Sequence, residues 1–401
     1  MTTKSTIEKE NRHMTTFFKK IPVSIERGEG VYVWDEEGNR FLDFTAGWGV
    51  TCLGHAHPVI IQALLEQSGK IMQGPASGVT YSPARASLLS LLVSILPANL
   101  TRIFFSSSGA ESNDAAIKLA RKVTGRPDIV SALQGFHGRT TSTTSATRPA
   151  TRREQSNPLT PGNRFVSYGD IASLEVILDS QVAAVLLEPI QSEGGVRIPP
   201  DSYLEEAGKL CRANGSLLIV DEVTTGFCRT GPMFAIDPLN VEVDFMTMAK
   251  GIAGGFPFGA FALSEEVAAK LGYGDHGGTY CGNPLGCAVA HAVISCLIDS
   301  GISGNVKEIG ALALGRMMKW MQNWPEAITD VRGRGLLLAA EFRDEATASR
   351  ITDACLAQGL FVRQTMGNII RIFPALNIRQ EEMEEGLAIL ERAIEGAVKT
   401  I

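Results

Sequence analysis

The most regular pattern in the chain is a series of short apolar runs that each end abruptly in polar or charged residues. The runs occupy 102–105, 128–133, 182–187, 217–220 and 245–249. Continuous apolar runs of this length are typical of strands that are buried on both faces of a parallel sheet. Segments with helical spacing of apolar residues, such as 203–214, lie between the runs. This alternation predicts a doubly wound α/β domain.

Two of the runs end in residues that suit one chemical task. Asp221 follows the run 217–220, and Lys250 follows the run 245–249 just before a Gly-rich loop. Ligands bind beyond the carboxyl ends of parallel strands, so both side chains are expected in one crevice. A desolvated Lys has a lowered pKa and can form a Schiff base, while a carboxylate can keep a pyridine nitrogen protonated. Taken alone, the pair is equally compatible with a structural ion pair that caps two strands.

Two turns of small residues are candidate anion sites. The first contains Ser108, Gly109 and Ala110 and precedes an Ala/Lys/Leu-rich helix. The free N–H groups and the dipole at such a helix start bind phosphate, although an ordinary Ser N-cap has the same sequence. The second turn, 276–284, also precedes an apolar helix and offers Thr279 as a further phosphate contact.

Aromatic and charged residues follow other strands. Phe136 and Arg139 lie in a Gly-rich loop, where an aromatic ring can stack on a planar group and an Arg can bind a carboxylate. A lone aromatic residue in a loop is more often simple packing. Glu188 and Glu193 lie just past another strand end. Arg371 is surrounded by apolar residues, and a buried Arg requires an anionic partner.

The remaining segments predict the periphery of the molecule. Residues 1–20 are polar and are expected to be an arm that is ordered only against a partner. Residues 28–44 contain two β-rich runs around a turn and predict a hairpin, whereas 45–58 is too rich in Gly for a regular element. The Ser/Thr/Arg/Pro-rich segment 141–163 is expected to be a surface loop. The last hundred residues alternate helices with short strands, which predicts a small α+β domain.

Composition narrows the class of protein. A length of 401 residues favours two domains, and 44% hydrophobic with 20% charged residues describes a soluble globular protein. The net charge of -6 argues against nucleic acid or an anionic membrane as a partner. Seven cysteines without a C-x-x-C pair suggest free thiols in a reducing compartment, so a cytoplasmic location is expected. The sequence contains no apolar run long enough for a membrane span, no apolar leader and no metal-ligand spacing.

Seven motifs together resemble the class III (subgroup II) aminotransferases that use pyridoxal phosphate, most closely the acetylornithine and ornithine branch. The motifs are Leu53-Gly-His-Ala-His-Pro58, Ser108-Gly-Ala-Glu, Phe136-His-Gly-Arg-Thr140, Glu188-Pro-Ile-Gln-x-Glu-Gly-Gly, Asp221-Glu-Val, Ala249-Lys-Gly, and Arg371 followed shortly by Pro-Ala-Leu. The resemblance extends from Gly28 to the final helix.

The resemblance implies an aspartate-aminotransferase-like fold of type I, with a mainly parallel seven-stranded sheet in a large domain and a small α+β domain. The expected division is an N-terminal arm with part of the small domain in 1–50, the large cofactor-binding domain in 51–290, and the C-terminal small domain in 291–401. A homodimer with its active sites at the subunit interface is also implied.

The family also implies residue roles in cofactor binding. The residues implied to contact pyridoxal phosphate are Ser108, Gly109, Ala110, Phe136, Glu188, Asp221, Val223, Thr224, Lys250 and Thr279. Lys250 would be the Schiff-base lysine and would move the substrate proton. Asp221 would bind the pyridinium N–H, with Val223 and Phe136 on the two ring faces. Thr279 would reach the phosphate of the partner subunit.

For the substrate, the resemblance implies Trp48, Arg139, Glu193 and Arg371. Arg139 would bind the carboxylate of the amino donor, and Arg371 the α-carboxylate of glutamate. An ω-amino donor has no carboxylate on the reacting carbon, and an unpaired buried Arg costs about 3 to 5 kcal/mol. Glu193 would therefore cover Arg371 until a substrate carboxylate displaces it.

The chain departs from the family pattern at two positions. Thr224 stands where the family usually has Gln, and Trp48 where the acetylornithine branch usually has a small or aliphatic residue. Trp48 could narrow the pocket or favour an aromatic or apolar amine. The predicted function is transfer of an amino group from an N-acetylornithine- or ornithine-like ω-amine to 2-oxoglutarate by ping-pong chemistry. The alternatives are a 4-aminobutyrate or other ω-amine aminotransferase, a racemase or epimerase of the same fold, and a non-catalytic protein that kept the fold.

Overall fold

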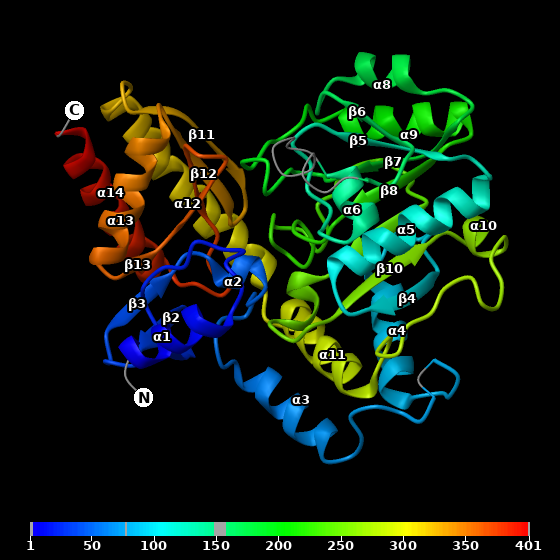
Figure 1. The fold of residues 1–401 in the computed structure, drawn as a ribbon, viewed down its shortest axis with the longest axis horizontal. Coiled ribbons are helices and arrows are strands. Elements are labelled where there is room, and N and C mark those ends of the chain that lie inside the picture. Colours follow the sequence, from blue (N-terminus) through cyan, green and yellow to red (C-terminus); the bar gives the residue numbers. More distant parts are fainter. Residues whose placement is uncertain (1–2, 77, 148–157, 400–401) are drawn as a thin grey trace.

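The computed structural model describes residues 3–76, 78–147 and 158–399. Figure 1 shows two parts: a large sheet with its helices, and a smaller part that contains both the N-terminal strands and the C-terminal helices. The first and last segments of the chain therefore lie together, which is why the small part cannot be read from one continuous stretch of sequence.

The large sheet has seven strands in the order β4-β10-β9-β8-β7-β5-β6. The strands are β4 (Arg102–Ser106), β5 (Asp128–Ala132), β6 (Asn163–Val166), β7 (Val182–Leu187), β8 (Leu217–Asp221), β9 (Phe245–Met248) and β10 (Gly259–Leu263). All neighbouring pairs are parallel except those of β10, which runs antiparallel to β4 and β9. The predicted mainly parallel seven-stranded sheet is confirmed, and the five apolar runs correspond to five of its strands.

Both faces of the large sheet are buried, which accounts for the continuous apolar runs. All six residues of β7 are buried; Val185 and Leu187 belong to the core on one face, and Ala184 and Leu186 to the core on the other. Helix α5 (Gly109–Thr124) packs on β7, β8, β9 and β10. The other helices of this part are α3 (Pro58–Ser68), α4 (Pro83–Ile95), α6 (Thr141–Ala146), α8 (Ile171–Ile177), α9 (Tyr203–Asn214), α10 (Glu265–Ala268) and α11 (Pro284–Asp299).

The smaller part contains two four-stranded sheets. The first has the order β1-β2-β3-β13, with β1 (Ile25–Glu29), β2 (Tyr32–Asp35), β3 (Arg40–Asp43) and β13 (Leu360–Phe361). The second is antiparallel with the order β11-β12-β15-β14, from β11 (Ile328–Arg334), β12 (Leu337–Phe342), β14 (Arg363–Thr365) and β15 (Ile369–Ile372). Its C-terminal helices are α12 (Ile302–Asn323), α13 (Glu345–Ala357) and α14 (Gln380–Val398). A small α+β part is thus confirmed, while the exact boundaries at 50 and 290 stay a prediction.

The structure differs from the sequence predictions in two peripheral segments, the N-terminal arm and residues 141–163. Helix α1 (Thr3–His13) is ordered against its own chain, because Thr3 and Thr6 donate hydrogen bonds to Glu37 and Glu36 at 2.5 and 3.1 Å. The prediction of an arm that is ordered only against a partner is wrong for this helix.

The segment 141–163 is likewise not a continuous surface loop. It begins with α6, whose Ala146 is buried and accepts a hydrogen bond from Ser131 Oγ of β5 at 2.7 Å. Small side chains let this helix pack closely on the sheet. Residues 148–157 lie outside the described residues, and 163–166 form β6 at the edge of the sheet.

Helix α12 was not predicted, because three glycines weaken its helical pattern. One of them has a packing role: a Cβ on Gly310 would lie 2.3 Å from the carbonyl oxygen of Gly335. The close approach of the β11–β12 turn therefore requires glycine at this position. Among the described residues no single helix is long and apolar enough to cross a membrane; α11 and α12, bent by 67°, pass a test of length and composition only as a pair.

Candidate active site

Lys250 lies directly after β9, at the carboxyl end of the parallel strands. It begins a short 3-10 helix, Lys250–Ala253, with a positive φ of 45°. Its Nζ donates a hydrogen bond to Thr224 Oγ1 at 2.5 Å. Burial lowers the pKa of Lys250; Arg371 acts in the same direction, whereas Glu193 opposes both. A lowered pKa makes the neutral, nucleophilic amine more available.

Asp221 ends β8 on the next strand and is held by several donors. Its Oδ2 accepts hydrogen bonds from Asn113 Nδ2 at 2.7 Å and His137 Nδ1 at 2.8 Å, and Oδ1 accepts one from the N–H of Val223 at 3.0 Å. Asn113 is itself fixed, because its Oδ1 accepts a hydrogen bond from Thr247 Oγ1 at 2.6 Å. Asp221 is 3% exposed, so these contacts define one orientation for a buried carboxylate.

Three members of this network, Asn113, His137 and Thr247, were not predicted from the sequence. Burial alone would lower the pKa of His137, but its hydrogen bond to Asp221 and the charges of Asp221 and Glu188 outweigh burial and raise it. The sequence offers one signal for Thr247, which is a hydroxyl residue inside an otherwise apolar run. In the structure it pairs in register with Asp221. Asn113 and His137 lie on a helix and in a loop, so only the fold brings them to Asp221.

Glu188 follows β7 and fastens the loop that carries Phe136. Its carboxylate accepts hydrogen bonds from the N–H of Phe136 at 3.0 Å and of Ser192 at 3.2 Å. Burial raises the pKa of Glu188 to about 7; the charge of His137 opposes this shift and that of Asp221 adds to it. The structure thus places Glu188 beneath the aromatic loop, beside the Asp221 network.

The turn at the start of α5 lies against the segment that follows β8. Ser108 is the N-cap of α5, and its Oγ accepts a hydrogen bond from the N–H of Glu111 at 3.2 Å. The first N–H groups of a helix lack partners within the helix, so those of Gly109 and Ala110 remain suited to an anion. A Cβ on Gly109 would lie 2.7 Å from Val223 Cγ1, so only glycine permits this approach.

Arg139 and Thr279 stand apart from this cluster. Arg139 is exposed, and its guanidinium lies 5.2 Å from the ring centroid of Phe18. Thr279 is exposed too, and its carbonyl oxygen accepts a hydrogen bond from Gln73 Nε2 at 2.7 Å. Within the part of the chain that the structure describes, no hydrogen bond or ion pair joins either residue to Lys250 or Asp221.

Arg371 and Glu193 form an ion pair on the side of the site formed by the antiparallel sheet of the smaller part. Arg371 lies in β15 and is 1% exposed. Its Nη1 donates hydrogen bonds to Glu193 Oε1 at 2.8 Å and to Ser192 Oγ at 3.0 Å. Burial alone would raise the pKa of Glu193, but the positive charges of Arg371 and Lys250 outweigh burial and lower it. The Glu193 carboxylate is therefore ionised and couples electrostatically to Lys250.

Trp48 lies beside this ion pair in the short helix α2 (Ala46–Gly49). It has a positive φ of 67° and is 43% exposed. The guanidinium carbons of Arg363 and Arg371 lie 4.8 and 5.8 Å from its ring centroid. Arg363 was not predicted, because in sequence it begins a short polar strand that looks like a surface edge.

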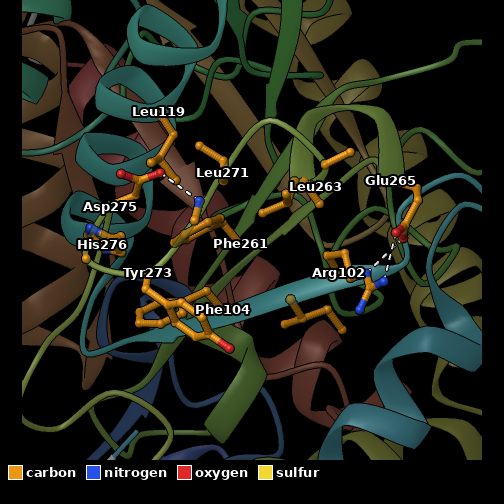
Figure 2. A pocket seen from close by; sticks show the side chains of 15 residues that line it. Arg102, Phe104, Leu119, Phe261, Leu263, Glu265, Leu271, Tyr273, Asp275 and His276 are labelled. Carbon is orange, nitrogen blue, oxygen red and sulfur yellow. Dashed lines mark hydrogen bonds and ion pairs between the residues drawn. The ribbon is translucent and has the colours of Figure 1, made fainter. Parts of the chain in front are cut away.

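A cavity of about 510 Å³ lies away from Lys250, at the other end of β4 and β10 (Figure 2). The register pairs Gly259 with Ser106 near the phosphate-type turn and Leu263 with Arg102 at the cavity. An ion pair between Arg102 and Glu265, at 2.7 Å, borders the cavity. This cavity is therefore separate from the Lys250 site.

A lysine and an anchored carboxylate at the ends of neighbouring parallel strands, beside an anion-binding turn, define a pyridoxal phosphate enzyme of fold type I. Residues 15–394 match the family model described as aminotransferase class-III. The chain belongs to the class III aminotransferase family, whose members depend on pyridoxal phosphate.

Relatives of known name cover nearly the whole chain. An acetylornithine aminotransferase from Methanothermobacter thermautotrophicus is 40% identical over 394 residues, covering 98% of this chain and 99% of the relative. A [LysW]-aminoadipate semialdehyde transaminase from Deinococcus radiodurans is 37% identical over 387 residues, covering 96% and 89%. The ornithine aminotransferase of Toxoplasma gondii superimposes with a TM-score of 0.95 at 29% identity, covering 100% of this chain and 97% of the other. A second structure of that enzyme shows partial occupancy of pyridoxal phosphate at its active site.

Proposed function

We propose that this aminotransferase moves an amino group from an ω-amino donor of the N-acetylornithine or ornithine type to 2-oxoglutarate, with both half-reactions in one pocket. The observation that carries the proposal is the pairing of Glu193 with the buried Arg371 next to Lys250. A pocket with this pair can accept a donor that has no carboxylate at the reacting carbon. It can also accept a 2-oxo acid once Glu193 moves away.

The residues present fit pyridoxal phosphate. Lys250, with its lowered pKa, would hold the carbonyl carbon of the cofactor, and the anchored Asp221 would bind its ring nitrogen. Ser108 and the N–H groups of Gly109 and Ala110 would hold the phosphate, because the first N–H groups of α5 have no partner within the helix. When bound, pyridoxal phosphate supplies an electron sink for the carbon that loses its proton.

The chain's own groups then have separate tasks. Lys250 Nζ moves the proton at the substrate carbon, and Thr224 Oγ1, 2.5 Å away, keeps that amine in place. Asp221 would keep the ring nitrogen of the bound cofactor protonated, and His137 and Asn113 fix the orientation of the Asp221 carboxylate. Glu188 holds the loop from which Phe136 would stack on the ring, while Val223 would cover the other face. Thr224 reaches Lys250 directly, so the shorter side chain at this position still has a contact in the site.

On the substrate side, Arg371 would take the α-carboxylate of glutamate, and Arg139 the carboxylate of the amino donor. With an ω-amine bound, Glu193 remains on Arg371 and the buried guanidinium keeps its counter-charge. With glutamate or 2-oxoglutarate bound, the substrate carboxylate replaces Glu193. The same arginine thus serves opposite requirements in the two half-reactions.

We also infer that two copies of the chain associate and that the enzyme works in the cytoplasm. Exposed large apolar side chains cluster on two adjoining segments; they are Ile71, Met72, Val79, Tyr81, Tyr273 and Tyr280. The segments are joined where Leu285 N donates to Met72 O at 3.3 Å and Gln73 to Thr279. A second copy would cover this surface and bring Thr279 to the neighbouring phosphate site. A molar mass of twice the chain mass in sedimentation equilibrium would support the dimer, and the mass of a single chain would refute it.

The cytoplasmic location is supported by the thiols, since all seven cysteines are free. Cell fractionation checks it directly, because an enzyme that works elsewhere would be recovered outside the cytosolic fraction.

The test of the function is the absorption spectrum of the protein with pyridoxal phosphate, before and after single additions of donors without an acceptor. The donors are N-acetylornithine, ornithine, 4-aminobutyrate, glutamate and an aromatic amine. We expect glutamate and an ornithine-type donor to convert the visible cofactor band, and Lys250→Ala to lack that band. Conversion by 4-aminobutyrate, and not by the ornithine-type donors, would show that the enzyme is a 4-aminobutyrate aminotransferase instead. A band that no donor moves would refute transamination and favour a racemase or epimerase.

A further inference from the structure

Displacement of Glu193 from Arg371 leaves a carboxylate that needs a new partner. Its side chain is 26% exposed, so solvent can hydrate it only in part. A carboxylate in such surroundings is stabilised mainly by a nearby cation. The question is which cation lies within reach of the Glu193 side chain once a substrate carboxylate occupies Arg371.

Arg363 lies in the right place. It is the register partner of Arg371 across the antiparallel strands β14 and β15. Directly opposite residues of an antiparallel pair lie on the same face, with Cβ atoms about 4.5 to 5.5 Å apart. Burial lowers the pKa of Arg363; Arg371 adds to this shift and Glu193 opposes it. The Glu193 charge therefore already acts on both arginines.

Arg363 is also free to accept a partner. Its Nε is buried without a hydrogen-bond partner, and within the described ranges its guanidinium makes no hydrogen bond or ion pair. The guanidinium stacks on Trp48 at 4.8 Å from the ring centroid, an attractive cation–π contact that holds it in position. The Arg363 guanidinium is therefore a positioned cation that can still accept a carboxylate partner.

The backbone of Glu193 is fixed, so only its side chain has to move. Its carbonyl oxygen accepts a hydrogen bond from Thr365 Oγ1 at 3.0 Å, two residues from Arg363 on the same strand. Gly195, two residues after Glu193, is also held, because its carbonyl oxygen accepts a hydrogen bond from Arg332 Nη2 at 2.6 Å. Rotation about the side-chain bonds of Glu193 is the remaining freedom.

We propose that Arg363, held by Trp48, is the alternative partner of Glu193, which pairs with Arg371 when an ω-amine is bound and with Arg363 when glutamate or 2-oxoglutarate is bound. The inference rests on the proposed function, because it requires two half-reactions in one pocket. It also gives Trp48 a purpose other than selecting an aromatic amine: its ring supports the guanidinium. Arg363 is thus a positioning residue for the glutamate half-reaction.

A double-mutant cycle tests this inference. The proteins are the wild type, Arg363→Leu, Glu193→Gln and the double variant, and kcat/KM is measured separately for the glutamate and the ω-amine half-reactions. We expect Arg363→Leu to lower the glutamate value about 10- to 100-fold and to leave the ω-amine value within about threefold. In the Glu193→Gln background, Arg363→Leu has no effect on glutamate, because no carboxylate needs a new partner.

Further variants separate charge from structure. Arg363→Lys keeps the cation and is expected to restore most of the glutamate reaction, and Arg363→Gln repeats the Leu result if Arg363→Leu is insoluble. Arg392→Leu, a change at an exposed arginine of α14 that bonds Gln358, is the matched control and leaves both half-reactions unchanged.

Three outcomes overturn the inference. Equal losses for both substrates would mean a structural role for Arg363. A glutamate defect that persists in the Glu193→Gln background would mean that Arg363 binds the substrate itself. An unaffected glutamate reaction would mean that Glu193 uses another partner. A wild-type protein that converts neither substrate would instead refute the proposed function, which the wild-type spectra reveal before any variant is compared.

Discussion

Replacing Glu193 by Gln isolates the electrostatic requirement of the substrate pocket. In the free enzyme, the buried Arg371 is paired with Glu193 at 2.8 Å and also bonds Ser192 Oγ at 3.0 Å. The amide keeps the size of the side chain but removes its charge. In the variant, Arg371 therefore keeps its hydrogen bond to Ser192 and loses its carboxylate partner.

The expected magnitude depends on which states carry the unpaired charge. Loss of one partner from a buried ion pair costs about 3 to 5 kcal/mol. An ω-amine leaves Arg371 unpaired both before and after binding, so most of this cost cancels from its kcat/KM. Glutamate removes the cost by supplying a carboxylate. Because displaced Glu193 regains part of its stabilisation in the wild type, we expect a net gain of about 1.4 to 2.8 kcal/mol, or 10- to 100-fold in kcat/KM for glutamate.

Stopped-flow absorption of the two half-reactions, each at several substrate concentrations, measures this effect. The glutamate reaction should become faster at low concentration, while the ω-amine reaction stays within about threefold. Glutamate should also become a stronger competitor of the ω-amine in the variant. A glutamate reaction that is unchanged or slower would refute the reasoning that Glu193 must leave Arg371.

Two further predictions concern the cofactor side and the fold. Asn113→Leu removes a donor to Asp221 and leaves Thr247 Oγ1 without its acceptor, so pyridoxal phosphate should bind about 1 to 3 kcal/mol more weakly in a fluorescence titration; unchanged affinity would show that Asp221 is oriented without Asn113. Burial raises the pKa of Glu222 from 4.5 to about 8, against the opposing hydrogen bonds of Thr225 and Ile236. Because the folded pKa is raised, the contribution of Glu222 is complete below about pH 4.5 and is lost as pH rises through about 8. Urea unfolding between pH 5 and 9 should therefore show up to about 1.4 kcal/mol per pH unit of extra loss in the wild type relative to Glu222→Gln, and parallel pH profiles would contradict it.

The sequence predicts those parts of the fold in which burial produces a simple pattern of apolar residues. Strands such as β7 are apolar on both faces, so they appear as continuous runs without any knowledge of their neighbours. Edge strand β6, Asn163–Val166, has half its residues polar because only part of it is covered. Strand β10 is apolar, but it follows a Gly-rich loop directly, so the sequence does not show where the strand begins. Helix α12 is obscured by three glycines, of which Gly310 is needed where the β11–β12 turn approaches.

The same reasoning separates the predictable from the unpredictable site residues. Lys250 and Asp221 stand directly after apolar runs, and a charged residue at the end of such a run is evident from the sequence alone. Asn113, by contrast, is an ordinary polar residue in a helix until α5 packs on β8 and β9. Arg363 depends on the antiparallel register of β14 and β15, which short polar strands do not reveal.

The segment between Glu188 and Glu193 joins the two halves of the site. Ser192 donates its N–H to Glu188, which holds the aromatic loop. Its hydroxyl accepts a hydrogen bond from Arg371, which is proposed to bind the substrate carboxylate. The two carboxylates of this segment have opposite shifts: burial raises the pKa of Glu188, whereas the neighbouring cations lower that of Glu193. The residues proposed to hold the cofactor come mostly from the large sheet and its loops. Arg371 and Arg363 come from the antiparallel sheet of the smaller part, and Trp48 comes from α2. Changes at β14 and β15 can therefore alter substrate charge preference while the Asp221 network, and with it the proton chemistry at Lys250, stays intact.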